Sequence, residues 1–290
     1  MKLNSQCILC LLKRHEETAL KHGDQEQATA FIRDLMRLLA EGPADMSAPY
    51  YTPGIARLFC DHYGLSEDRF AEEKEASNRY ALSRFDKLTN LVRTAEDPLY
   101  AGLQAAILGN YIDFAALQGE VSFEKLDEML ELLHTIEVDR DTFAQLRADL
   151  ESGRELLYLT DNAGEIVFDR VWLELIRDTF PNLAITVCVR GGPAQNDATL
   201  EDAKTAGIPF PVIDNGTCIS GTVLEEASKD LKDAMGRADV VISKGQANVE
   251  TLLDTDHGCN LYFAFLIKCK RFIDRFGKEN LQRWRRCLHT

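Results

Sequence analysis

Residues 155–169 read ELLYLTDNAGEIVFD and combine a strand pattern, a polar turn and a helix pattern. The apolar run at 156–159 predicts a short buried strand, and a helical apolar pattern follows after the turn. Asp161 and Asn162 therefore stand at the carboxyl end of a strand, which is where open α/β sheets bind ligands. Their oxygens are donors that Mg²⁺ or Mn²⁺ prefers, and Gly164 would let the backbone approach an anion. The alternative is that Asp161 or Asn162 only caps the helix.

The pattern of the chain changes at Gly153. Up to that residue it is helical, including one long charged helix expected at 72–91. After it, short apolar runs alternate with helices, which is typical of a helix-flanked parallel sheet. The expected strands are 156–159, 184–189, 211–213, 240–243 and 262–267, and the expected helices are 166–180, 198–206, 222–235 and 247–253. We therefore predict an α/β protein, with an N-terminal all-helical domain (1–153) followed by a Rossmann-like three-layer domain with a mostly parallel sheet (154–290).

Composition narrows the possible partners. The chain has 290 residues, 45% of them hydrophobic, and a formal net charge of −14, which argues against nucleic acid and against an anionic membrane surface. No apolar run approaches the roughly 20 residues that a membrane span requires, and the N-terminus lacks a signal-peptide core. We expect a cytoplasmic protein whose eight cysteines are reduced. The sequence sets no oligomeric state.

A cysteine pair opens the chain. Cys7 and Cys10 lie three residues apart, so on a helix they would share one face. Such a pair can be two buried thiols, half of a zinc site or a redox pair. The nearest candidates to complete a zinc site are Cys60 and His62.

The other strand ends add polar residues to the same edge of the expected sheet. They are Arg190 to Pro193, Asn196 and Asp197, Asp214 to Gly216, Ser243 to Gln246, and Lys268. Asp161, Asn162 and Asp197 would form an oxygen site for a divalent cation, with positions left for water and substrate. Gly245 would permit a tight turn, and Lys268 could neutralise a phosphate oxygen.

A polar pair also interrupts the helical half. Asn110 and Asp113 are three residues apart and would point the same way on a continuing helix. If the helical domain contributes to substrate binding, Asn110 and Asp113 are the residues expected to do so. The alternative is that Asn110 satisfies a backbone group at a bend caused by Gly109.

Several common motifs are missing. The glycine pattern of a dinucleotide fold does not follow the first strand, and the chain has no Walker lysine motif and no Gly-x-Ser-x-Gly elbow. The motifs that are present resemble the DUF89 family of metal-dependent damage-control phosphatases, in family order and over nearly the whole chain. They are Cys7-x-x-Cys10, Gly109-Asn110-x-x-Asp113-Phe114, Thr160 to Glu165, Asn196-Asp197, Ser243 to Glu250, and Leu266-x-Lys268-Cys269.

The resemblance implies a set of roles. A divalent metal would be held by Asp161, Asn162 and Asp197, and the substrate would contact Glu165, Lys268 and the loop of Ser243, Lys244, Gly245 and Gln246. The N-terminal cysteine pair resembles the stand-alone prokaryotic branch of the family. Because the activity is best defined in other branches, the resemblance does not supply the substrate.

These features lead us to expect hydrolysis of a small phosphorylated metabolite with Mg²⁺, Mn²⁺, Co²⁺ or Ni²⁺. Water bound to the metal could attack phosphorus, with Lys268 stabilising charge on the phosphoryl oxygens, or Asp161 could attack instead. Two alternatives are a SAM-dependent carboxyl methyltransferase, an activity proposed for a eukaryotic relative, and a non-catalytic metal- or ligand-binding protein in which Cys7 and Cys10 hold zinc.

Overall fold

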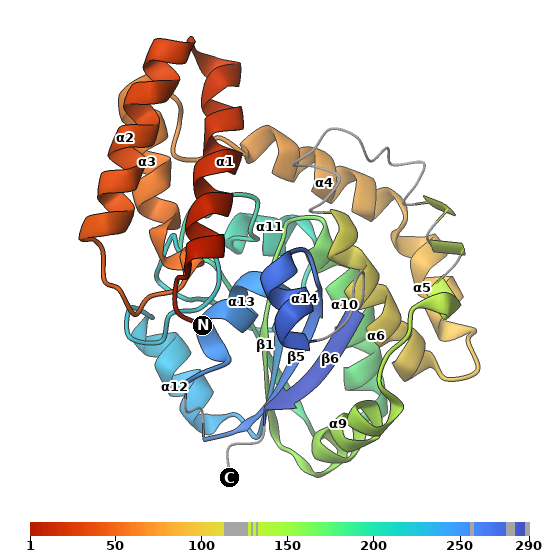
Figure 1. Cartoon of the computed structure of the whole chain (residues 1–290). Coiled ribbons are helices and arrows are strands. Elements are labelled where there is room, and N and C mark those ends of the chain that lie inside the picture. The colour runs from red at the N-terminus through yellow and green to blue at the C-terminus, as the bar shows by residue number, and fades with distance from the viewer. Residues whose placement is uncertain (113–126, 129, 132, 256–257, 277–281, 288–290) are drawn as a thin grey trace.

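The computed structural model describes residues 1–112, 127–128, 130–131, 133–255, 258–276 and 282–287 (Figure 1). Its centre is a sheet formed by β1 (Glu155–Leu159), β2 (Ala184–Val189), β3 (Val212–Asp214), β4 (Val240–Lys244), β5 (Asn260–Leu266) and β6 (Gln282–Cys287). The strand order is β3-β2-β1-β4-β5-β6; β1 to β5 are parallel, and β6 is antiparallel to β5. The predicted fold class, a helical part followed by a Rossmann-like layer with a mostly parallel sheet, is confirmed.

Helices cover both faces of the sheet because alternate strand residues point to opposite sides. The helices after β1 are α10 (Glu165–Thr179), α11 (Leu200–Thr205), α12 (Lys229–Arg237), α13 (Gly245–Leu252) and α14 (Lys270–Phe276). Leu156 and Tyr158 enter the larger core, which they share with α10. Leu157 and Leu159 enter a second core, which they share with α12, α13 and α14. The two cores give the three layers.

The N-terminal half is helical, as predicted. Its elements are α1 (Ser5–His22), α2 (Gln25–Glu41), η1 (Ala48–Tyr51), α3 (Thr52–Tyr63), α4 (Ala71–Ser83), α5 (Phe85–Arg93), α6 (Pro98–Gly109), η2 (Leu133–Thr135) and α9 (Arg140–Ser152). The bundle of α1, α2 and α3 stands at the upper left of Figure 1 and has its own core around Phe31, Leu35 and Phe59. Helix α6 instead packs on α10 and belongs to the core of the sheet. A domain boundary at residue 153 stays a prediction, and the largest core draws residues from both sides of it.

Three elements differ from the expected ones. The helix predicted at 72–91 is two helices, α4 and α5, that meet at Arg84. The guanidinium of Arg84 donates to both carboxylate oxygens of Asp127 at 2.6 Å. The helix predicted from residue 222 begins only at Lys229, where Ser228 accepts a hydrogen bond from the Leu231 N–H. Strand β6 was not expected. Among the described residues, no helix is both long and apolar enough to cross a bilayer.

Candidate active site

Two strand ends meet where the sheet order reverses, between β1 and β4. From β1 the chain proceeds outward through β2 and β3, whereas β4 leads to β5 on the other side. The crevice at such a switch point is the usual ligand site of an open α/β sheet. Asp161 follows β1 and Gly245 follows β4 at this point. A Cβ atom at Gly245 would lie 1.9 Å from Oδ2 of Asp161, so only glycine permits this approach.

The structure brings together the three residues predicted to hold a metal. Asn162 and Asp197 pair through an antiparallel bridge, and the Ala198 N–H donates to the Asp161 carbonyl oxygen at 2.7 Å. The residues are buried, with 5%, 3% and 4% of the surface of Asp161, Asn162 and Asp197 accessible to solvent. Backbone pairing between the two loops therefore fixes the relative positions of these three residues.

Amide groups set the orientation of Asp161. Its Oδ2 accepts hydrogen bonds from Nδ2 of Asn110 and from Nδ2 of Asn162, both at 2.8 Å. The Asn162 amide also donates to Oε2 of Glu165 at 2.8 Å, so its nitrogen must face the carboxylates and its oxygen is turned away from them. Within the described part of the chain, neither Oδ1 of Asp161 nor Oδ1 of Asn162 has a hydrogen-bond partner. Oδ1 of Asp161 does form an ion pair with Arg190.

Arg190, which the sequence placed at a strand end without a role, sits between the two carboxylates. Its Nε donates to Oδ2 of Asp197 at 2.5 Å, and its Nη2 lies 3.9 Å from Oδ1 of Asp161. The side chain is almost fully buried, and Nη2 has no hydrogen-bond partner in the described structure. A guanidinium in this position orients Asp197 and supplies positive charge inside the site. The signal that could have found it is an arginine directly after an apolar strand.

The donor set fits a hard divalent cation. Burial raises the pKa of Asp161 well above its usual value, Glu165 and Asp197 raise it further, and Lys268 and Arg190 offset this in part. A cation bound between Asp161 and Asp197 would stabilise the ionised carboxylates against both burial and mutual repulsion. Carboxylate and amide oxygens are the ligands that Mg²⁺ and Mn²⁺ prefer. The described residues contain no cluster of three or more His, Cys, Asp or Glu side chains suited to a metal. The candidate ligands here are two carboxylates and one amide, fewer than the six ligands of octahedral Mg²⁺.

Lys244 and Glu165 lie behind these residues. Nζ of Lys244 is 2.6 Å from Glu165 Oε1 and 2.6 Å from Asp169 Oδ1, and it also donates to the Ala106 carbonyl at 2.8 Å. All three charged side chains are fully buried, and burial raises the pKa of Asp169 to about 7 although Lys244 lowers it. This placement differs from the substrate contact expected for Glu165 and Lys244. Glu165 accepts a hydrogen bond from the side-chain amides of both Asn110 and Asn162, so it helps to orient these two side chains.

Helix α4 supports the turn after Asn162 from the other side. The Gly164 N–H donates to Oδ1 of Asn78 at 2.7 Å, and the Asn78 amide donates to Asp202 at 2.8 Å. Asp202 in turn forms a buried ion pair with Lys74 at 2.7 Å. No role could be predicted for these α4 residues, because their partners lie far along the chain.

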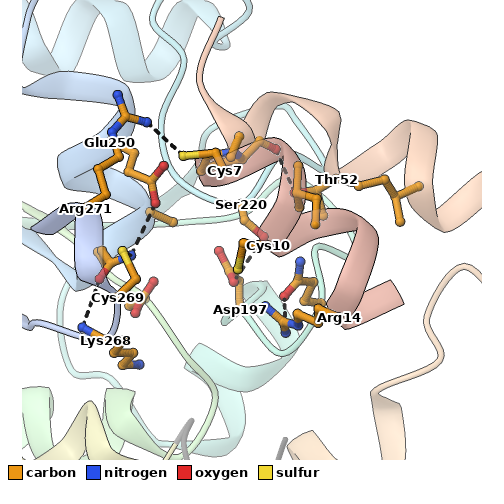
Figure 2. A pocket seen from close by; sticks show the side chains of 18 of the residues that line it. Cys7, Cys10, Arg14, Thr52, Asp197, Ser220, Glu250, Lys268, Cys269 and Arg271 are labelled. Atoms are coloured by element: carbon orange, nitrogen blue, oxygen red, sulfur yellow. Dashed lines mark hydrogen bonds between the residues drawn. The ribbon is translucent and has the colours of Figure 1, made fainter. Parts of the chain in front are cut away.

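A cavity of about 430 Å³ opens in front of the site. Asp161, Asp197 and Lys268 line it from the strand ends, and Cys7 and Arg14 line it from α1. Figure 2 shows Asp197, Lys268, Cys7 and Arg14 around it. Lys268 is also held by its backbone, because its N–H donates to Oε1 of Gln246 at 3.1 Å. Gln246 lines the cavity too.

Five of the predicted site residues that the structure describes do not line it, namely Glu165, Lys244, Ser243, Gly245 and Asn110. Ser243 and Gly245 are buried, with the Ser243 hydroxyl lacking a partner among the described residues. Asn110 reaches the site through Asp161, as described above. Asp113 lies outside the described residues.

The cysteine pair lies on the wall of this cavity. Cys7 Sγ accepts a hydrogen bond from Nη1 of Arg271 at 3.0 Å, and Cys10 is exposed. His62 pairs with Asp34 at 3.0 Å, and within the described residues it does not join the cysteines in a metal site. The structure therefore does not complete the zinc site considered from the sequence.

Comparison with known proteins identifies the family. The model of the damage-control phosphatase ARMT1-like domain matches residues 3–283. The damage-control phosphatase PH1575 of Pyrococcus horikoshii is 30% identical over 274 residues, which cover 93% of this chain and 92% of that protein. A damage-control phosphatase of Archaeoglobus fulgidus is also 30% identical, with 93% of each chain covered.

A solved structure agrees with these matches. The crystal structure of the DUF89 family protein from Pyrococcus horikoshii has a TM-score of 0.83 to this chain at 27% identity, with 99% of both chains covered. The agreement thus extends over sequence and fold alike, and the chain belongs to the damage-control phosphatase family with the ARMT1-like domain.

Proposed function

We propose that this protein is a metal-dependent phosphatase that hydrolyses the phosphate monoester of a small metabolite. The observation that carries the proposal is the convergence of Asp161, Asn162 and Asp197 at the inner end of a 430 Å³ cavity that Lys268 also lines. The relatives named damage-control phosphatase support the same class of reaction. Asp161, Asn162 and Asp197 would hold the cation, which would supply Lewis-acid activation of the phosphoryl group and of a water molecule.

The residues of the chain have separate tasks in this mechanism. Lys268 binds a phosphoryl oxygen, and its positive charge opposes the charge that accumulates on the phosphoryl group during transfer. Asn110 holds Asp161 in one orientation, and Arg190 does the same for Asp197. Because these supporting groups are buried and hydrogen-bonded, little reorganisation is needed when the substrate binds.

The nucleophile can be water or Asp161. In the covalent route, one Asp161 oxygen forms a bond to phosphorus while the ester oxygen leaves with the alcohol, and water then releases phosphate from the aspartyl phosphate. The stereochemistry of an isotopically chiral phosphate ester separates the routes. Net inversion at phosphorus means direct attack by water, and net retention means an Asp161 intermediate.

The proposal is tested by phosphate release from sugar phosphates, nucleotides and phosphopantetheine compounds, each with Mg²⁺, Mn²⁺, Co²⁺ or Ni²⁺. We expect metal-dependent turnover that falls at least about 100-fold in Asp161→Ala, because the variant loses a charged group at the reacting phosphoryl group. The metal affinity of Asp161→Ala, measured by calorimetry, should fall as well. Asp233→Ala, which removes an exposed carboxylate from α12, is the matched control. Turnover that needs no metal, or that survives in Asp161→Ala, contradicts the proposal.

A further inference from the structure

One face of α1 belongs to the cavity. Cys7, Cys10, Leu11 and Arg14 all line it, and their spacing of three, four and seven residues puts them on one stripe of the helix. The helical bundle therefore contributes a wall opposite the strand ends. A substrate in this cavity must have a part that faces α1.

That wall and the segment after β5 are rich in cations. Arg14 lines the cavity from α1, and Lys270 and Arg271 line it from α14. The one acidic side chain that lines the cavity beside the buried Asp161 and Asp197 is Glu250, among the residues the structure describes. Three cations against one carboxylate are unexpected in a chain with a formal net charge of −14.

The positions of these cations separate them from the inner site. Asp161 and Asp197 are almost fully buried, whereas Arg14 and Lys270 are exposed. A ligand whose phosphate contacts Asp161 and Lys268 can extend from the buried carboxylates toward these exposed side chains, because all of them line one cavity. The cavity volume of about 430 Å³ leaves room for such an organic part beyond a phosphate group.

The guanidinium groups of Arg14 on α1 and Arg271 on α14 are both held by hydrogen bonds. Arg14 Nη2 donates to Oε1 of Gln195 at 3.3 Å, and Arg271 donates to the Lys2 carbonyl at 2.6 Å in addition to Cys7. Gln195 itself has a φ of 55°, a left-handed conformation that non-glycine residues rarely adopt. Strained backbone of this kind concentrates at binding sites. These hydrogen bonds go to neutral groups, and Glu250 is an acidic side chain whose charge acts on Arg271. The remaining N–H groups of each guanidinium can donate to an oxyanion.

We propose that the substrate carries a second oxyanion, a carboxylate or another phosphate, at the end remote from its phosphate ester, and that Arg14, Lys270 and Arg271 bind it. This inference rests on the proposed phosphatase function and narrows its substrate class. A phosphorylated alcohol with an uncharged tail would leave these three cations with Glu250 as their counter-charge in the described lining, and it would be the poorer substrate.

The test uses two esters that differ only at the remote end. Gluconate 6-phosphate carries a carboxylate where glucitol 6-phosphate carries a hydroxymethyl group. We expect kcat/KM of the wild-type protein to be at least about tenfold higher for the gluconate ester, since a charge-assisted contact is stronger than a neutral one. In Arg14→Ala the ratio of the two kcat/KM values should fall about tenfold, and Arg14→Lys should restore part of it.

Lys13→Ala is the matched control. Lys13 is the exposed neighbour of Arg14 on α1 and does not line the cavity, so its removal should leave the ratio unchanged. Equal kcat/KM values for the two esters in the wild type, or an unchanged ratio in Arg14→Ala, overturn the inference while hydrolysis itself stands.

Failure of the phosphatase proposal gives a different result, namely no phosphate release from either ester with any metal. In that case, calorimetric titration of the wild type and Arg14→Ala with the same two esters decides the inference. Tighter binding of the gluconate ester that is lost in Arg14→Ala supports the oxyanion site. Equal binding of both esters overturns it.

Discussion

Gly245 shows how one residue determines the geometry of the candidate site. Its φ is +78°, and a Cβ atom there would lie 1.9 Å from Oδ2 of Asp161 and 2.0 Å from its Cγ. We predict that Gly245→Ala displaces the Asp161 carboxylate and lowers phosphatase kcat/KM at least about 100-fold, as a displacement of about 1 Å can. The measurement is steady-state kinetics together with circular dichroism, which should still report a folded protein.

The control is Gly236→Ala in α12, where nothing lies within 4 Å of an added Cβ. Alanine is a better helix former than glycine, so this variant should keep full activity and unfold at an equal or slightly higher temperature. Full activity in Gly245→Ala would mean that the approach of Gly245 to Asp161 is not needed for the reaction.

Whether the position of a single residue could be predicted depends on where its partners lie along the chain. Asp161, Asn162 and Asp197 could be predicted because each follows a strand end, and parallel strands bring such ends to one edge. The position of Lys244 could not be predicted, since its partner Asp169 lies far along the chain on α10. From its place after a strand, Lys244 was expected to contact the substrate from a loop. In the structure it forms a buried ion pair with Asp169 instead.

At the scale of elements, the buried cluster of Lys244, Glu165 and Asp169 joins β4 to α10. We predict that Lys244→Met lowers the free energy of unfolding by about 3 to 5 kcal/mol, because it leaves two carboxylates buried without their cation. Urea unfolding followed by fluorescence measures the change. Lys229→Met, which breaks an exposed pair with Asp233 on α12, should leave the urea midpoint nearly unchanged. Equal midpoints for the two variants would argue against a stabilising role of the buried cluster.

The bundle of α1, α2 and α3 holds a buried histidine that makes its stability depend on pH. His15 packs edge-on against Phe59 with its Nδ1 unpaired in the described structure, and burial lowers its pKa to about 3. Between pH 6.5 and 3 the unfolded chain therefore binds a proton at His15 that the folded chain does not. This difference destabilises the fold as the pH falls, by about 2 kcal/mol between pH 6.5 and 5.

The prediction is that His15→Leu removes this loss. Urea unfolding at pH 7, 6 and 5 should show a shallower decline in the free energy of unfolding than in the wild type. His134→Gln, which changes an exposed histidine, should retain the slope of the wild type. An unchanged slope in His15→Leu would mean that His15 is not the group responsible.

Elements could be predicted where periodicity was clean. The strands expected at 184–189 and 240–243 match β2 and β4 closely, because buried parallel strands are continuous apolar runs. The break between α4 and α5 was missed because the Arg84 contact with Asp127 is a tertiary one that leaves no periodic signal. Three of the six residues of β6, QRWRRC, are arginine, and so charged a stretch is typical of a surface and hides an antiparallel edge strand.

In the molecule as a whole, the separate hydrophobic cores predict that the bundle of α1, α2 and α3 can unfold without the sheet. The core of the bundle around Phe31 and Phe59 is distinct from the two cores that hold the sheet. A unit with a small core of its own opens at lower free energy than the global transition. We therefore expect the amides of α2 and α3 to exchange with solvent by a local opening, while the amides of β1 exchange only by global unfolding.

Phe31→Ala tests this expectation, because Phe31 is fully buried and its ring centroid lies 4.4 Å from that of Phe59. The variant should lower the protection of the bundle amides by an amount equivalent to about 3 to 5 kcal/mol and leave the protection of β1 nearly unchanged. Met36→Ala, at a half-exposed position of α2, is the control and should change neither. A parallel loss of protection in β1 and the bundle would show that the molecule unfolds as one unit.

Ligand binding should act on the same equilibrium. The cavity is lined by α1 on one side and by the strand ends on another. A ligand that contacts both sides therefore binds only while the bundle is folded. Saturating phosphate ester should then increase the protection of the bundle amides as its concentration rises above the dissociation constant, by about 2.7 kcal/mol at a hundredfold excess. Protection that rises only around Asp161 would place the ligand on the sheet side alone. Protection that also rises in α1 would mean that the ligand stabilises the bundle as well.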